Sequence, residues 1–115
     1  MPTAANLLAR SLALAALLAV AVIAAGADLP AYAVTLDSGR IEPARLEVPA
    51  GIKFKLLLHN AGSGPAEFEG RDLQVEKVLA PGARSFVVIP PLRPGTYRFF
   101  DEFHPGAADM VLVAK

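Results

Sequence analysis

The chain has 115 residues, 11 of them basic and 11 acidic, so its formal net charge is zero. This length leaves room for one domain, and scattered Lys and Arg residues in a neutral chain exclude the basic surface of a nucleic-acid-binding protein. A hydrophobic content of 54% excludes a disordered chain, and the lack of Cys excludes disulfides, thiolate zinc sites and iron–sulfur clusters.

The N-terminal part is typical of a targeting signal. Residues 7–27 form an Ala, Leu and Val run with a single Arg, and Ala31-Tyr32-Ala33 is a small-x-small cleavage site directly after Pro30. We therefore predict a signal peptide at 1–33 and an exported domain at 34–115. The alternative is that the apolar residues 12–27 are retained as a membrane anchor, because their number comes close to the minimum for spanning a bilayer.

The remainder reads as short strands separated by turns rich in Pro and Gly. No segment has the 3.6-residue period of an amphipathic helix, and turn signals recur about every ten residues. The sequence therefore predicts an all-β, antiparallel sandwich or barrel. The expected strands are 40–48, 52–59, 66–69, 73–79, 84–89, 96–100 and 109–114.

The last two expected strands flank a loop with groups that bind metals. Tyr97 and Phe99 should share one face of a strand, since side chains alternate with period two, and Asp101 follows at the strand's end. The chain then returns through a loop that contains His104 into a strand that begins near Met110. Carboxylate, imidazole and thioether groups would thus bracket one loop at one pole of the sandwich, which indicates a metal site.

This arrangement resembles the C-terminal metal loop of the cupredoxins. The resemblance rests on G-x-Y-x-F at residues 95–99, followed by a ligand position, two residues, His, a short loop and Met. Residues 45–51, 56–60 and 92–97 are similar to the sequence framework of the same superfamily. The resemblance implies a Greek-key β-sandwich or barrel of the cupredoxin type.

Two further stretches narrow the resemblance. Residues 65–69 and 99–105 are similar to the small periplasmic cupredoxin-like domains of bacterial ferrous-iron uptake systems, the EfeO/FtrB type. That type implies a periplasmic protein that binds iron and/or copper, works with an iron permease or other uptake components, and touches the membrane only through a partner. The resemblance leaves open whether the protein oxidises Fe(II) before delivering the iron to the permease, and therefore whether it is an enzyme.

The resemblance also implies the ligands. Asp101 occupies the position at which a blue-copper protein has Cys, and Glu67 that of the upstream His, so we expect neither the blue colour nor the electron transfer of a copper–thiolate site. Two carboxylates and an imidazole suit Cu(II), Fe(II) or Fe(III). The expected metal-site residues are Glu67, Asp101, His104, Met110, Glu69 and Glu102.

Each of these residues also has an ordinary structural interpretation. Acidic side chains on a strand are often plain surface charges, an Asp can stabilise a turn, and a Met at the start of an apolar strand can be packing. Motifs of hydrolases, P-loop proteins, dinucleotide-binding enzymes and zinc proteases are absent from the sequence. The alternatives to an iron-uptake protein are a copper-binding or copper-buffering protein and a metal-free interaction domain with the same fold.

Overall fold

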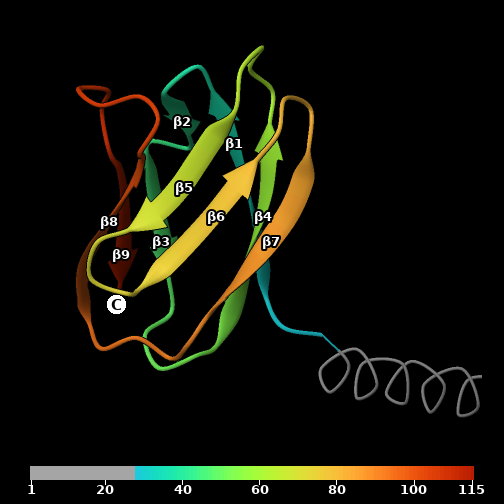
Figure 1. The fold of residues 1–115 in the computed structure, drawn as a ribbon. Helices are drawn as coiled ribbons and strands as arrows, with labels where there is room; N and C mark the ends of the chain where they lie inside the picture. Colours follow the sequence, from blue (N-terminus) through green and yellow to red (C-terminus); the bar gives the residue numbers. More distant parts are fainter. Residues whose placement is uncertain (1–27) are drawn as a thin grey trace, which may run out of the picture.

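The computed structural model describes residues 28–115, which fold into β-strands in two layers (Figure 1). The predicted signal peptide or anchor lies almost entirely outside the described residues. The strands are β1 (Ala31–Asp37), β2 (Arg40–Glu42), β3 (Arg45–Val48), β4 (Phe54–Asn60), β5 (Ala66–Gly70), β6 (Val75–Leu79), β7 (Arg84–Ile89), β8 (Gly95–Asp101) and β9 (Met110–Ala114). Within this part of the chain, no helix is long and apolar enough to cross a membrane.

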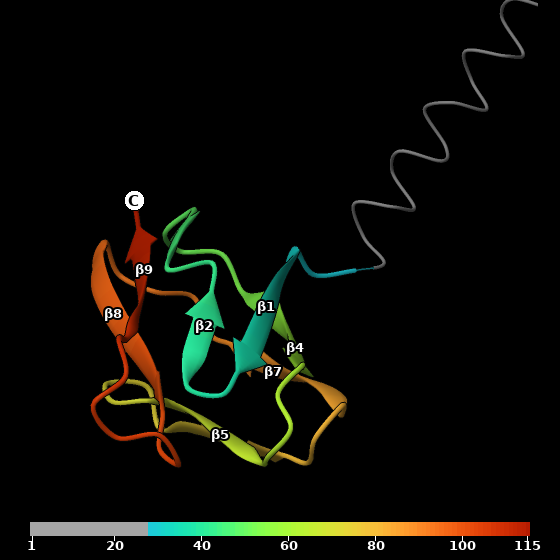
Figure 2. The ribbon, with the colours of Figure 1, turned by 90° about the horizontal axis from the view of Figure 1, so that it is seen from above.

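The strands form a four-stranded sheet in the order β2-β1-β4-β7 and a five-stranded sheet in the order β3-β9-β8-β5-β6. Figure 2, which looks down on the molecule, shows the two layers facing one another. β1 runs parallel to β4, and β3 runs parallel to β9, whereas the other paired strands are antiparallel. The predicted all-β sandwich is confirmed.

Alternation along the strands places the core between the sheets. In β4, Phe54, Leu56 and Leu58 point inward and are at most 2% exposed, while the residues between them face outward. Within the core, the rings of Phe68 and Phe99, which lie on the neighbouring strands β5 and β8 of one sheet, stack at 4.9 Å and 9°. Apolar burial of this kind stabilises the fold by about 25 cal/mol per Å² removed from water, and no disulfide contributes.

The observed strands agree with the expected ones within about two residues, with two differences. The expected strand at 40–48 is divided into β2 and β3 at residues 43–44, and the two parts join different sheets. The second difference is β1, which the sequence analysis did not include. Ala31, Tyr32 and Ala33 pair with Lys55, Leu56 and Leu57 of β4.

The expected domain boundary therefore falls inside a strand. Cleavage after Ala33 would remove the first three residues of β1, so the folded domain in the structure begins at least three residues before the expected start at Val34. The cleavage itself stays a prediction.

Asn60 holds the connections at one pole of the sandwich together. This side chain is 1% exposed, and its Nδ2 lies within 3.2 Å of the carbonyl oxygens of Gly64, Leu79 and Ala80, while its Oδ1 accepts from Gly62 N–H at 3.0 Å. One buried amide thus links the β4–β5 loop to the β6–β7 turn. β5 starts from this pole, which fixes where its first side chains lie.

Candidate metal site

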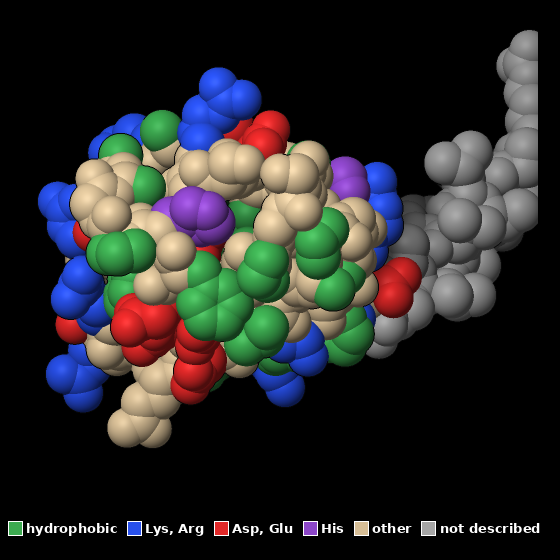
Figure 3. Space-filling model, turned by 45° about the horizontal axis from the view of Figure 1, so that its top comes forward, with side chains coloured by type: hydrophobic (Ala, Val, Ile, Leu, Met, Phe, Trp, Pro, Cys, Tyr) green, Lys and Arg blue, Asp and Glu red, His purple; other side chains and the backbone are tan. Residues whose placement is uncertain are grey.

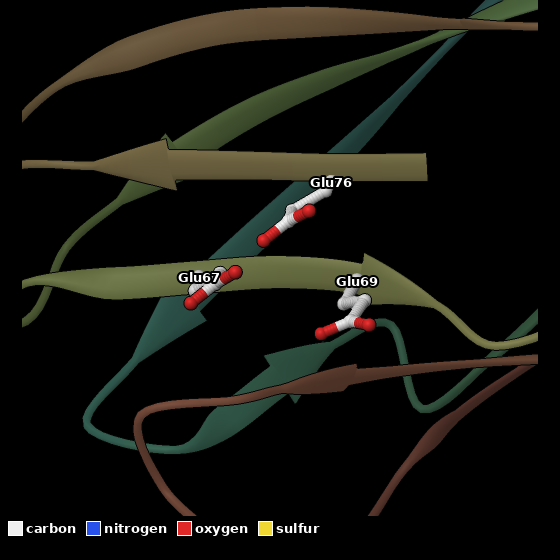
Figure 4. A group of neighbouring side chains, drawn as sticks. All are labelled: Glu67, Glu69 and Glu76. Atoms are coloured by element: carbon white, nitrogen blue, oxygen red, sulfur yellow. The ribbon is translucent and has the colours of Figure 1, made fainter. Parts of the chain in front are cut away.

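Three glutamates come together on the outer face of the five-stranded sheet. Glu67 and Glu69 are two residues apart on β5 and therefore share a face, and Glu76 of β6 lies opposite Glu69 in the antiparallel register. One carboxylate oxygen of each can be chosen so that all three lie within 4.8 Å of one another. Figure 4 shows the carboxylates of these residues, here called the acidic cluster, on the two neighbouring strands.

The surroundings of the acidic cluster raise the proton affinity of two of its members, Glu67 and Glu69. A hydrogen-bonding contact with the Glu76 carboxyl, together with burial and the nearby charges of Glu76, Glu69 and Glu102, raises the pKa of Glu67 to about 7 from an ordinary 4.5. Burial and the Glu102 carboxylate raise the pKa of Glu69 as well. Like charges held together disfavour the ionised form, and a bound cation would remove that penalty.

Among residues 28–115, no Lys or Arg forms an ion pair with the acidic cluster, although the charge of Arg71 opposes the rise in the pKa of Glu69. The ion pairs within these residues involve other carboxylates. Glu67 is also largely buried, with 7% of its surface exposed. The nearby Arg71 instead lies over the ring of Phe100, with its guanidinium carbon 4.3 Å from the ring centre. Figure 3 shows acidic side chains gathered on one face of the molecule, close to apolar groups and a histidine.

Asp101 lies beside the cluster but points the other way. Its side chain is fully buried, its Oδ1 accepts hydrogen bonds at 3.0 Å from the backbone N–H groups of Glu67 and Phe103, and its Oδ2 lies 2.8 Å from Nδ1 of His104. Both oxygens of this carboxylate are therefore already engaged inside the protein.

His104 is held at the entrance of the C-terminal loop. Its side chain is 34% exposed, and its Nδ1 is engaged by Asp101, which leaves Nε2 as the free ring nitrogen. It lines a hollow of about 180 Å³ together with Arg71 and Asp109. On its other side the imidazole packs on the β1–β2 turn, where a Cβ added to Gly39 would lie 2.9 Å from the His104 Cβ.

The six expected ligands therefore separate into three groups. Glu67 and Glu69 belong to the acidic cluster, and Glu102 adjoins it. Asp101 and His104 form a hydrogen-bonded pair in which only Asp101 is buried, and Met110 is completely buried in the core, where it pairs with Phe99 across β8 and β9. Among the described residues, these six do not form a single group of adjacent ligand atoms.

Glu76 is the residue that sequence reasoning missed. Alternation along β6 places it on the outer face with Val78, which the sequence could have indicated. Its position opposite Glu69 depends on the register of the β5–β6 hairpin, which is set by the turn at residues 71–74.

Comparison with known structures supports the same architecture. The structures include a purple cupredoxin from Nitrosopumilus maritimus (TM-score 0.54, 18% identity, 72% of this chain and 98% of the other) and reduced auracyanin from Roseiflexus castenholzii (0.63, 15%, 76% and 98%). A third is the metal-binding domain of the Cu(I)-exporting P-type ATPase CopA of Streptococcus pneumoniae D39 (0.61, 13%, 74% and 84%). At these identities, the likeness establishes the cupredoxin fold.

The family is established by sequence. The cupredoxin-like domain family model matches residues 10–114, and the chain belongs to that family. An uncharacterized protein of Rickettsia prowazekii (strain Madrid E) is 34% identical over 82 residues, which are 71% of this chain and 66% of the relative's length. The expected cupredoxin-like fold is thereby confirmed.

The residues at the C-terminal loop do not fit a blue-copper centre. The chain contains no Cys, so the thiolate that defines such a centre is missing. Asp101, which stands at the corresponding position, has both oxygens engaged by protein groups, and the Met110 side chain packs in the core.

Proposed function

We propose that the domain binds a hard metal cation at the acidic cluster and that iron is its physiological cation. The observation that carries the proposal is the Glu67 carboxylate, which is buried against another carboxylate without a basic partner among residues 28–115. A carboxyl group in this position either keeps a proton or exchanges it for a cation, and oxygen donors select hard cations over Cu(I).

Iron is the first candidate for two reasons. Anionic oxygen donors bind Fe(III) more strongly than Fe(II), so a site of three or four carboxylates favours the ferric state of bound iron. In addition, residues 65–69, which include two members of the cluster, carry the resemblance to the domains of ferrous-iron uptake systems. We propose that the protein is exported to the periplasm and hands its iron to a permease in the membrane.

Cu(II) binding at His104 is the second candidate. The partly exposed imidazole, with Nε2 free and Asp109 lining the same hollow, offers nitrogen and oxygen donors of the kind that Cu(II) accepts. The CopA domain, which has the same fold, was solved with Cu(I). This reading would make the protein a copper-binding or copper-buffering component.

Parallel titrations separate the two candidates. We expect Fe(III), supplied as a weak citrate complex, to bind the parent protein, and Glu76→Gln to weaken that binding by about tenfold or more because one ligand is lost. His104→Ala should leave more iron affinity than Glu76→Gln does. Cu(II) binding that His104→Ala abolishes and Glu76→Gln leaves unchanged, without iron binding, would support copper instead. A parent protein that binds neither metal would indicate a metal-free interaction domain.

A further inference from the structure

The buried Asp101 carboxylate has no part in the proposed cation site, although it lies next to it in the fold. Its side chain is 0% exposed, and its three contacts are with Glu67 N–H, Phe103 N–H and the His104 imidazole. A carboxylate that already receives two N–H groups and faces an imidazole has little capacity left for a cation. Its burial inside the pole also separates it from the outer face of the sheet.

The hydrogen bond from Glu67 N–H to the Asp101 carboxylate lies where the pairing of β5 with β8 ends. The last paired residues are Phe68 and Asp101, so Glu67 is one position beyond the ladder. Its carbonyl oxygen accepts from Glu102 N–H at 2.9 Å, and its N–H donates to Asp101 Oδ1 at 3.0 Å. A side-chain oxygen thus takes the place of the backbone acceptor that regular pairing would provide.

We infer that Asp101 is a positioning residue for the acidic cluster: its carboxylate fixes the backbone of Glu67 and the start of the loop that carries Glu102. The inference rests on the proposed function, because it concerns the same cation site. Since Oδ1 holds Glu67 and Phe103 together, it sets the separation between β5 and the chain after β8. The carboxylates of Glu67 and Glu102, which are close enough to act on one another and on Glu69, are oriented by that separation.

His104 supports the same arrangement from the protein's surface. Its Nδ1 engages the second oxygen of Asp101, and its own backbone N–H donates to the Asp101 carbonyl at 3.0 Å. The imidazole therefore fixes the orientation of the carboxylate plane, as a metal-site partner does when it orients a ligand without binding the metal. Asp101 and His104, two of the six ligands that the sequence suggested, therefore act through Glu67 in this account.

A positioning carboxylate and a ligand carboxylate respond differently to the same substitution. In Asp101→Asn, the amide oxygen can still accept from Glu67 N–H and Phe103 N–H, and the amide nitrogen can donate to an imidazole that is protonated on Nε2. A charged ligand would lose its bond to the cation in this variant. Asp101→Ala removes the side-chain acceptor altogether, so it should weaken cation binding whether Asp101 positions Glu67 or binds the cation itself.

The experiment uses Mn(II) as an EPR-visible hard cation with the purified full-length protein. We expect Asp101→Asn to bind within about threefold of the parent, and Asp101→Ala to bind about tenfold or more weakly, as is typical when a supporting partner of a ligand is removed. Electron spin-echo spectra of the bound Mn(II) should contain no imidazole nitrogen coupling. The Glu67 amide resonance should move in Asp101→Ala and stay near its parent position in Asp101→Asn.

Two outcomes overturn the inference. If Asp101→Asn loses as much affinity as Glu67→Gln while retaining its NMR spectrum, or if nitrogen coupling appears, the Asp101–His104 pair belongs to the ligand set, and the proposed metal site survives. If the parent does not bind Mn(II), Fe(III) or Fe(II), the proposed function fails and the positioning role fails with it. Should Asp101→Ala not fold, the Asn variant and the spin-echo measurement still decide.

Discussion

Replacing Asn60 by Ala tests how the pole that carries the candidate site is built. The amide has two N–H bonds for three carbonyl oxygens within 3.2 Å and one oxygen that accepts from Gly62, so about three hydrogen bonds are lost. At about 1 kcal/mol net for each bond, the free energy of unfolding should fall by about 3 kcal/mol. In a domain of this size, that loss lowers Tm by roughly 12–24 °C.

Urea denaturation followed by circular dichroism measures this change. His59→Gln is a matched control, because His59 is the neighbouring residue on the outward side of β4 and pairs there with Arg84 and Thr35. It should change stability by less than about 0.5 kcal/mol. A loss below about 1 kcal/mol in Asn60→Ala would show that other contacts hold the loops of this pole, and would refute the reasoning.

The remaining predictions concern pH, the His104 loop and processing. Because the folded-state pKa of Glu67 is raised from 4.5 to about 7, the folded protein retains a proton that the unfolded chain releases, so the stability of the metal-free protein should fall as pH rises from about 5 to about 8. Denaturation curves at both pH values should show this fall and its reduction in Glu67→Gln; a rise with pH in the parent would contradict it. Over the same range, cation affinity should increase, because binding displaces that proton, and calorimetry in buffers of different ionisation enthalpy would detect the release. Gly39→Ala should destabilise the protein by about 1–3 kcal/mol, since φ is +94° and the added Cβ meets His104, and an unchanged urea midpoint would count against this packing. N-terminal sequencing of protein from the cell envelope should find a processed chain, and an intact Met1 would indicate a retained segment.

Most of the strands were predictable because they follow local rules. Turns such as Ala80-Pro81-Gly82 and Pro94-Gly95 separate segments that alternate with period two, and these segments became β4 to β9. The strand β1 was missed because its first residues coincide with the small-x-small site after the apolar run. The division between β2 and β3 was missed because alternation does not reveal which sheet each half joins.

The candidate site was less predictable because it depends on long-range pairing. Glu67 and Glu69 were recognised from the resemblance, but their meeting with Glu76 requires the register of β5 on β6. The direction of Asp101 was available from the sequence: it is two residues after Phe99 and so shares that residue's inward face. The bonds from Asp101 to Glu67 and His104 were not available, since they depend on how β8 lies beside β5.

The most direct test of the central claim is a ferric-iron titration of two triple variants with the same change in charge. One variant replaces the acidic cluster, Glu67, Glu69 and Glu76, by Gln. The control replaces three acidic residues elsewhere, as Asp37→Asn, Glu42→Gln and Glu47→Gln, whose carboxylates instead pair with basic side chains.

The measurement is the affinity of the folded protein for Fe(III) in competition with citrate. We predict that the parent and the control bind with affinities within about threefold of one another, and that the acidic-cluster variant binds at least about a hundredfold more weakly. Equal losses in the two variants would mean that net charge alone attracts the cation, and unchanged binding in the acidic-cluster variant would place the metal elsewhere; either result contradicts the account.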